Sequence, residues 1–202
     1  MIRGSISAEG SKSFSPILDT VGFFAPSVED LQLLADAFRI VADSIPRPLS
    51  LQQSRFACIR TAQWGHANRD TVAALNAAVE LLQQQGAEVV DVQLPTDFDD
   101  LHHWHRVLMQ TNGAVTFYSD YISAGDQLDP LLRGYVENKG GWSHADRLEA
   151  MDGISKLRPL ADSIIGAFTA VITPSAMGEA PAMTRENMKK RLLVVVTLMR
   201  PV

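Results

Sequence analysis

The sequence predicts an α/β fold, because a strand pattern, a helix pattern and a second strand pattern follow one another with short connections. Residues 56–59 form a short apolar run of the kind found in buried strands. Residues 70–85 carry apolar side chains at helical spacing, and Gly86 follows where a helix favours a left-handed residue. Residues 89–92 are rich in valine, and Pro95 ends that run. Together these segments form a βαβ unit, so we expect the two strands to be parallel.

Further helices are predicted on both sides of this unit. Ser27 and Asp30 have the form of a capping box, in which the serine accepts from an amide and the acid reaches back. The box predicts a helix over about 28–42. Helical spacing also predicts helices over 99–122 and 144–168.

Prolines limit the structure of the C-terminal half. Pro159 lies inside the predicted helix 144–168, so we expect a kink or a break there. Residues 170–173 form a brief apolar run that Pro174 stops, which predicts a buried strand.

Composition and charge narrow the class of protein. The chain has 202 residues, of which 46% are hydrophobic and 20% charged, as in ordinary globular domains. Its net charge of −5 and the lack of a basic stripe exclude nucleic acid as an expected partner. Residues 1–15 lack the pattern of a secretory signal, and the apolar stretch 192–199 is shorter than the ~20 residues that span a bilayer. We expect a cytoplasmic chain with no membrane partner and no cofactor.

The sequence has a single cysteine, Cys58, so no disulfide forms within one chain. This usage is typical of a reducing compartment. Its place inside an apolar run predicts a buried small hydrophobe. A reactive thiol is the alternative, although no neighbour in the sequence would clearly lower its pKa.

Two adjacent motifs resemble a known family. Residues 15–22 read Ser-Pro-Ile-Leu-Asp-Thr-Val-Gly, and residues 25–30 read Ala-Pro-Ser-Val-Glu-Asp. Together they resemble a signature block of the amidase family, in which an S-x-x-L-D-T-x-G turn leads into a helix that begins R-S-V-x-D. This chain has Pro26 where arginine is usual.

Later segments agree with this resemblance. Residues 86–95 are similar to the helix-to-strand step of the family. Residues 172–175, with Ala-Pro at 180–181, are similar to its late strand and the loop after it. The His-Arg pair at 105–106 resembles a pair found on a helix in many relatives. The resemblance covers residues 4–183 and rests on the order and spacing of these motifs.

The resemblance implies part of an amidase-like mixed sheet with helices on both faces, formed by an incomplete C-terminal domain over residues 1–183. It also implies hydrolysis of a carboxamide C–N bond by a serine nucleophile, a second serine on a cis peptide, and a lysine. In the family these groups precede the Asp-Thr-x-Gly block. We therefore expect this chain to lack the Ser-Ser-Lys triad, to have no catalytic residue of its own and to be inactive alone. Its partner would be a small-molecule amide once the missing part is supplied.

Local serines are poor substitutes for that triad. Only Gly4 precedes Ser5, whereas a serine nucleophile needs preceding amides as an oxyanion hole and a second group that activates it. Ser11 and Ser13 flank Lys12, but adjacent residues rarely direct their side chains to one point. We interpret Lys12 as a solvated loop charge.

The histidines at 102, 103 and 105 raise the question of a metal site. On a helix His102 and His105 share a face, while His103 points elsewhere. Neither a carboxylate nor a cysteine stands four residues after His102 to complete a zinc site. We therefore expect no bound metal and interpret these residues as partly exposed histidines around the core residue Trp104.

Two loops contain the remaining candidates. Asp19 is a loop carboxylate, and we expect it to accept turn amides and to stabilise the loop before the Ser27 helix. Trp64 and His66 follow the first strand of the βαβ unit. Loops at the carboxyl ends of parallel strands hold ligands in such folds, so a substrate contact is one interpretation and an ordinary surface loop is the favoured one.

Residues 184–202 do not resemble the family and form an atypical tail. A frameshift or gene-calling artefact would explain them, and a short terminal helix or strand is the alternative. Three other functions stay open: a non-catalytic binding module on an amidase scaffold, a relative of an amidotransferase subunit, and a histidine-based metal protein. Uncovered apolar faces and strand edges also predict self-association.

Overall fold

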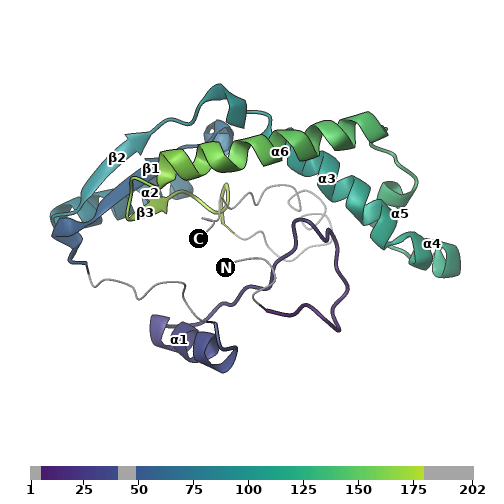
Figure 1. Ribbon diagram of the computed structural model, residues 1–202, viewed down its shortest axis with the longest axis horizontal. Helices are drawn as coiled ribbons and strands as arrows, with labels where there is room; N and C mark the ends of the chain where they lie inside the picture. Colours follow the sequence, from purple (N-terminus) through teal and green to yellow (C-terminus); the bar gives the residue numbers. More distant parts are fainter. Residues whose placement is uncertain (1–5, 41–48, 180–202) are drawn as a thin grey trace. The chain divides into compact units, whose positions relative to one another are not determined.

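The computed structural model describes residues 6–40 and 49–179 (Figure 1). These residues fall into two compact units. Among the described residues, the first unit comprises 6–40 and 101–156. The second comprises 49–100 and 157–179. A parallel sheet accompanied by helices confirms the predicted α/β class. The candidates at Gly4, Ser5 and the 184–202 tail lie outside the described residues.

The second unit is built on a three-stranded parallel sheet. Its strands, in the order β2-β1-β3, are β1 (Arg55–Ile59), β2 (Glu88–Val92) and β3 (Ala170–Ile172). Phe56 lies opposite Val89 of β2 and Ala170 of β3. Helix α2 (Arg69–Gln84) connects β1 to β2, which confirms the predicted parallel βαβ unit.

The C-terminal half of β1 is the buried centre of this sheet. Ala57, Cys58 and Ile59 are at most 1% exposed, as expected of a strand that is covered on both faces. Cys58 is therefore the buried hydrophobe that the sequence predicts. Burial raises the pKa of its thiol, an effect that the nearby Arg60 partly opposes. A thiol with a raised pKa stays protonated and is a poor nucleophile.

Local chemistry sets both ends of α2. Asn68 caps the first turn by accepting a hydrogen bond from the Thr71 amide at 2.9 Å. Gly86 adopts the left-handed conformation with φ +87°, as the sequence predicts. A Cβ at this position would also lie 2.9 Å from the exposed Gln52 side chain, which would have to shift.

Strand β3 is present but less buried than the sequence predicts. Ala170 is exposed, while Val171 and Ile172 are half-buried. The reason is position, since β3 pairs only with β1 among the described strands and so lies at an edge. Thr169 begins the pairing, because its amide donates to the Arg55 carbonyl at 2.7 Å.

The first unit contains helices α3 (Leu101–Thr116), α4 (Tyr118–Ala124) and α5 (Pro130–Val136). The helical structure predicted over 99–122 is present, but as two helices, because the chain breaks at Phe117. The ring of Phe117 packs edge-on against Phe14 at 5.4 Å, so a contact distant in sequence accompanies the break.

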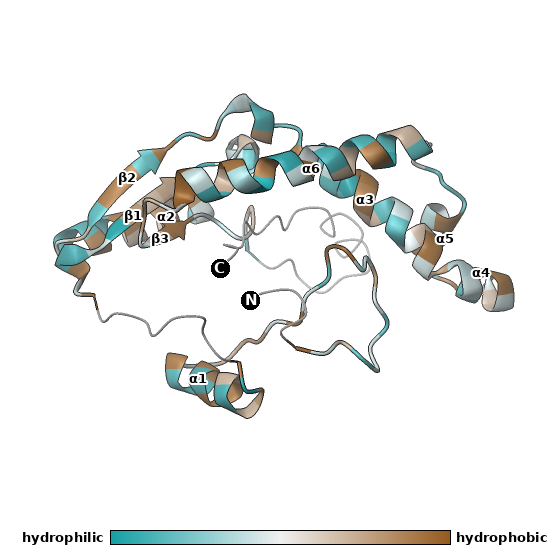
Figure 2. Ribbon diagram, viewed as in Figure 1, coloured by the Kyte–Doolittle hydropathy of each residue, from teal (hydrophilic) through white to brown (hydrophobic). Residues whose placement is uncertain are grey.

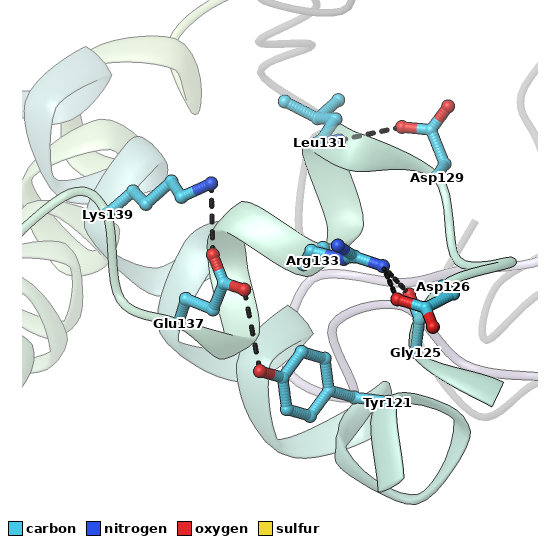
Figure 3. A network of polar contacts seen from close by, with 8 residues as sticks. All are labelled: Tyr121, Gly125, Asp126, Asp129, Leu131, Arg133, Glu137 and Lys139. Carbon is cyan, nitrogen blue, oxygen red and sulfur yellow. Dashed lines mark hydrogen bonds and ion pairs between the residues drawn. The ribbon is translucent and has the colours of Figure 1, made fainter. Parts of the chain in front are cut away.

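Helix α5 escaped the sequence prediction, although a signal for it exists. Asp129 accepts from the Leu131 amide at 2.8 Å and caps the helix, and Pro130 occupies the first turn. Glu137, just after the helix, links it to α4 (Figure 3): it accepts from the Tyr121 hydroxyl at 3.4 Å. Lys139 pairs with Glu137 at 3.0 Å and lowers the pKa of that carboxyl.

A small apolar core holds the first unit together. Its buried residues are Val107, Leu108 and Ala150. Around them pack the half-buried side chains Ile17, Leu18, Trp104, Trp142 and Ile154. A Cβ on Gly153 would lie 2.6 Å from the Trp104 ring, so this glycine lets the indole approach the helix closely.

Helix α6 (His144–Ile165) continues through Pro159, so the expected break is absent. Ser143 and Asp146 cap the start of the helix. The Asp146 amide donates to the Ser143 hydroxyl at 3.1 Å, and the Ser143 amide donates to the Asp146 carboxylate at 2.7 Å. Ser155, four residues before the proline, is exposed, so water can satisfy the carbonyl that Pro159 leaves without a donor. None of the described helices is both long and apolar enough to cross a membrane.

Helix α1 (Val28–Ala37) begins as predicted and ends early. The Asp30 amide donates to the Ser27 hydroxyl at 3.1 Å, and that hydroxyl donates to the Asp30 carboxylate at 3.0 Å. Arg39 adopts a left-handed φ of 52°, which stops the helix well before residue 42. No residue of α1 is buried, and Figure 2 shows hydrophobic positions along it.

Candidate functional site

A small pocket lies where β1 and β3 end in the second unit. Its volume is about 50 Å³. Besides two alanines, its walls are formed by Thr61, Gln63, Trp64, Pro174, Ser175 and Met177. Both strands are parallel, so their carboxyl ends meet at one edge of the sheet, where α/β folds place their ligands.

The β1 side of the pocket is held in place by a short 3-10 turn (Ala62–His66). Thr61 starts this turn, and its carbonyl accepts from the Trp64 amide at 2.9 Å. The Arg60 guanidinium lies 5.4 Å from the centre of the Trp64 ring. Arg60 is in turn paired with Asp91 of β2, so the contact links the Trp64 ring to the neighbouring strand.

The β3 side is tied to the start of α2. The Asn68 amide donates to the Met177 carbonyl at 2.7 Å. A Cβ on Gly178 would come within 2.3 Å of the Asn68 side chain, so only glycine allows this close approach. Just before the pocket wall, the Thr173 hydroxyl is buried and has no hydrogen-bond partner among the described residues.

The chemistry of the walls is neutral. Trp64, Pro174 and Met177 supply apolar surface, while Thr61, Gln63 and Ser175 supply uncharged donors and acceptors. None of the lining residues is an acid, a histidine, a lysine or a cysteine. The pocket can therefore bind an uncharged polar group, and its walls offer no general acid or base.

Of the two loop candidates, the structure brings one into the pocket. Trp64 is half-buried in the wall, whereas His66 is exposed and does not line the pocket. The sequence interpretation missed Thr61, Ser175 and Met177. Their signal was available, because each follows an apolar run predicted to be a strand.

Asp19 stabilises its loop, as the sequence predicts. Its Oδ2 accepts from the Ser13 hydroxyl and the Phe14 amide at 2.6 Å each, and from the Ser15 amide at 2.9 Å. Ser15 is 1% exposed, and its hydroxyl accepts from the buried amide of Asn112 at 2.9 Å. The amidase-like motif at residues 15–22 therefore forms a structural turn that is hydrogen-bonded to α3.

The three neighbouring histidines separate on the surface of α3. His102 Nε2 lies 3.2 Å from Arg106 Nη2, while the His103 ring packs edge-on against Trp142 at 5.5 Å. Burial lowers the pKa of His105, and the neighbouring His102 lowers it further. Among the described residues, no three His, Cys, Asp or Glu side chains gather as metal ligands would.

No family model matches the sequence. Among curated proteins, the chain is 24% identical over 178 residues to the 2-amino-5-chloromuconic acid deaminase of Comamonas testosteroni, which covers 87% of this chain and 38% of the deaminase. It is 26% identical over 133 residues to the mandelamide hydrolase of Pseudomonas putida, covering 65% of this chain and 26% of the hydrolase. Among solved structures, a crystal structure of an amidase matches with a TM-score of 0.77 and 19% identity, covering 89% of this chain and 40% of that one.

The resemblance to amidases is confirmed. A second structure, described as an inhibitor-bound vestigial protein complex related to an s-triazine catabolic enzyme, matches with a TM-score of 0.62 and 22% identity. It covers 79% of this chain and 36% of that one. The chain thus has the fold of part of an amidase and spans 38% or less of the length of these curated relatives.

Within this amidase-like fold, Ser11, Lys12 and Ser13 of the N-terminal loop each have a partner other than one another. Lys12 pairs with Asp120 and lies 5.1 Å from the centre of the Phe117 ring. The Ser11 hydroxyl donates to the Ala8 carbonyl at 2.6 Å. The Ser13 hydroxyl is bonded to Asp19, so no Ser-Lys pair forms here.

Proposed function

We propose that this chain is the C-terminal part of an amidase-type hydrolase and forms one wall of its amide-binding pocket. The neutral pocket at the ends of β1 and β3 carries this proposal. A carboxamide is an uncharged group that both donates and accepts hydrogen bonds, and Thr61, Gln63 and Ser175 present matching partners. Trp64 and Met177 offer apolar surface to the rest of the substrate.

The catalytic groups would come from a further segment. The relatives are at least twice as long as the part that this chain matches, which supports a larger whole. The Ser11 and Ser13 hydroxyls donate to local partners, and the pocket walls contain no acid or base. We therefore expect the chain alone to release no ammonia from mandelamide or benzamide above the uncatalysed rate.

Binding by the chain alone tests the pocket itself. We expect benzamide to shift the indole N–H signal of Trp64 saturably in NMR spectra, because its ring would pack on that indole. The signals of Trp104 and Trp142, which belong to the first unit, serve as internal controls. Benzoate should bind more weakly, since a neutral pocket does not compensate its charge.

Two outcomes would contradict these expectations separately. Ammonia release by the purified chain would refute the assignment of catalysis to another segment. An unchanged Trp64 signal, or equal shifts of all three indoles, would refute the amide pocket. Replacing Ser175 by alanine should weaken benzamide binding by about 1 kcal/mol if its hydroxyl bonds the amide.

A non-catalytic binding module is the second candidate function, and the absence of acids and bases from the pocket walls favours it. An experiment that joins the chain to the N-terminal part of the mandelamide hydrolase distinguishes these two candidate functions. Restored amide hydrolysis that needs both parts supports the enzyme. Benzamide binding together with an inactive, well-folded joined protein supports the binding module.

We also propose that the isolated chain self-associates. Val115, Tyr118 and Ile122 are exposed apolar residues on α3 and α4, each more than half accessible. We expect sedimentation velocity to show association that grows with protein concentration and weakens in Ile122→Lys. Leu81→Lys, at an exposed position on α2, is the matched control and should weaken association less. A concentration-independent monomer would contradict this proposal.

A further inference from the structure

Arg106 is a half-buried arginine on α3 whose charge is not neutralised by the described part of the chain. Its Nε is buried and has no hydrogen-bond partner there. None of the ion pairs among residues 6–40 and 49–179 includes Arg106. A guanidinium stays charged in proteins. Within residues 6–40 and 49–179, no carboxylate pairs with this positive charge.

Other arginines of the chain have partners that neutralise their positive charge. Arg133 also has a buried Nε without a partner, but its Nη2 donates to the Gly125 carbonyl and pairs with Asp126 at 3.2 Å (Figure 3). Arg55 is paired with Glu88, and Arg60 with Asp91. Unlike Arg55, Arg60 and Arg133, Arg106 has no carboxylate partner among the described residues.

The contact with His102 does not supply the missing charge. Arginine only donates hydrogen bonds, so His102 Nε2 must be the acceptor at 3.2 Å and must lack a proton. The imidazole is therefore neutral in this contact. It orients one edge of the guanidinium and leaves the positive charge intact. Holding such a charge away from water costs free energy unless an anion pairs with it.

We propose that Arg106 binds the carboxylate of a small organic acid. A planar guanidinium matches a carboxylate through two parallel hydrogen bonds, which an ammonium cannot reproduce. His102 holds Nη2 from one side, so the fork is oriented before the acid arrives. Arg106 belongs to the first unit, whereas the residues of the neutral pocket belong to the second. The inference therefore does not depend on amide hydrolysis.

The test compares the melting temperature of the full chain in sodium acetate and in sodium chloride at equal ionic strength. A ligand that binds only the folded state raises the melting temperature in a saturable way. We expect acetate to do so for the natural chain and not for Arg106→Met. Arg158→Met removes an exposed helical arginine and is the matched control, so it should keep the acetate response.

A structural arginine would behave differently from a ligand-binding one. In chloride we expect Arg106→Met to melt no lower than the natural chain, because it removes a half-buried charge that no described carboxylate neutralises. Arg106→Lys keeps the charge but loses the fork, so we expect half-saturation at roughly tenfold more acetate.

Several results would overturn the proposal. The first is a lower melting temperature, or loss of folding, in Arg106→Met. The second is an acetate response that persists in Arg106→Met or is undiminished in Arg106→Lys. The third is an acetate response of the natural chain that does not saturate. Inorganic phosphate is titrated in parallel, and a tighter response to phosphate would overturn the carboxylate assignment. N-acetylaspartate amide carries the carboxylate of a protein side chain, and we expect the chain to bind it no more tightly than acetate. A tighter response to it would overturn the assignment to a free acid.

Discussion

Replacement of Leu108 by alanine is expected to lower the free energy of unfolding by about 2–5 kcal/mol. Leu108 is 2% exposed and packs with Val107 and Ala150 at the centre of the first unit. Truncation removes buried apolar surface and leaves a cavity that the neighbouring helices cannot fill completely. Urea denaturation followed by circular dichroism measures the change, provided that the slope with denaturant stays constant.

The matched control is Leu148→Ala on α6. Leu148 is 47% exposed and also belongs to the first unit, so its truncation should cost only about 0.5 kcal/mol or less. Equal losses in the two variants would contradict the packing described for the first unit. Because that core has only three fully buried members among the described residues, a loss at Leu108 should affect the whole unit.

Replacement of Asp19 by alanine has the second large expected effect. It should lower the free energy of unfolding by about 1–3 kcal/mol, because the donors that Asp19 accepts from are left unsatisfied. One carboxylate oxygen accepts from Ser13, Phe14 and Ser15, and the turn it closes places the Ser15 hydroxyl against Asn112. Urea denaturation measures the stability. Amide hydrogen exchange at Phe14 and Ser15 should also accelerate in the variant, because their donors lose the acceptor.

Asp36→Ala provides the comparison for Asp19. Asp36 is an exposed carboxylate on α1 that accepts from Gln32 at 2.8 Å, so its removal should change stability by about 0.5 kcal/mol at most. If Asp19→Ala is no more destabilised than Asp36→Ala, the turn does not depend on the carboxylate. The amidase-like Asp-Thr-x-Gly pattern would then need another explanation than loop structure.

The sequence predicted best where neighbouring residues decide the structure. Ser27 caps its own helix, and Gly86 supplies the left-handed residue between α2 and β2. The βαβ unit follows from apolar periodicity with short connections, and it was predicted to within one residue at each boundary. Asp19 reaches only donors four to six residues away, so its role was also readable from the sequence.

The sequence predictions were less accurate where contacts with distant residues, or exposure to solvent, determine the local structure. The break at Phe117 accompanies a ring contact with Phe14, and the exposure of β3 depends on its place at the edge of the described sheet. Helix α6 continues through Pro159, and the residue whose carbonyl loses its donor, Ser155, is exposed.

The α/β class and the amidase resemblance could be read from the order and spacing of sequence motifs, and the turns and caps from residues within a few positions of each other. Contacts between distant segments could not be read in this way and are known from the folded structure. It joins the loop after β1 to the loop after β3 as one pocket, and it bonds Ser15 to Asn112 across 97 positions. It also shows that Arg106 lacks a carboxylate partner among the described residues, while Arg60 and Arg133 have one. The physical reason is that pockets and charge pairing arise from packing between segments, and no local pattern records which segments will pack together.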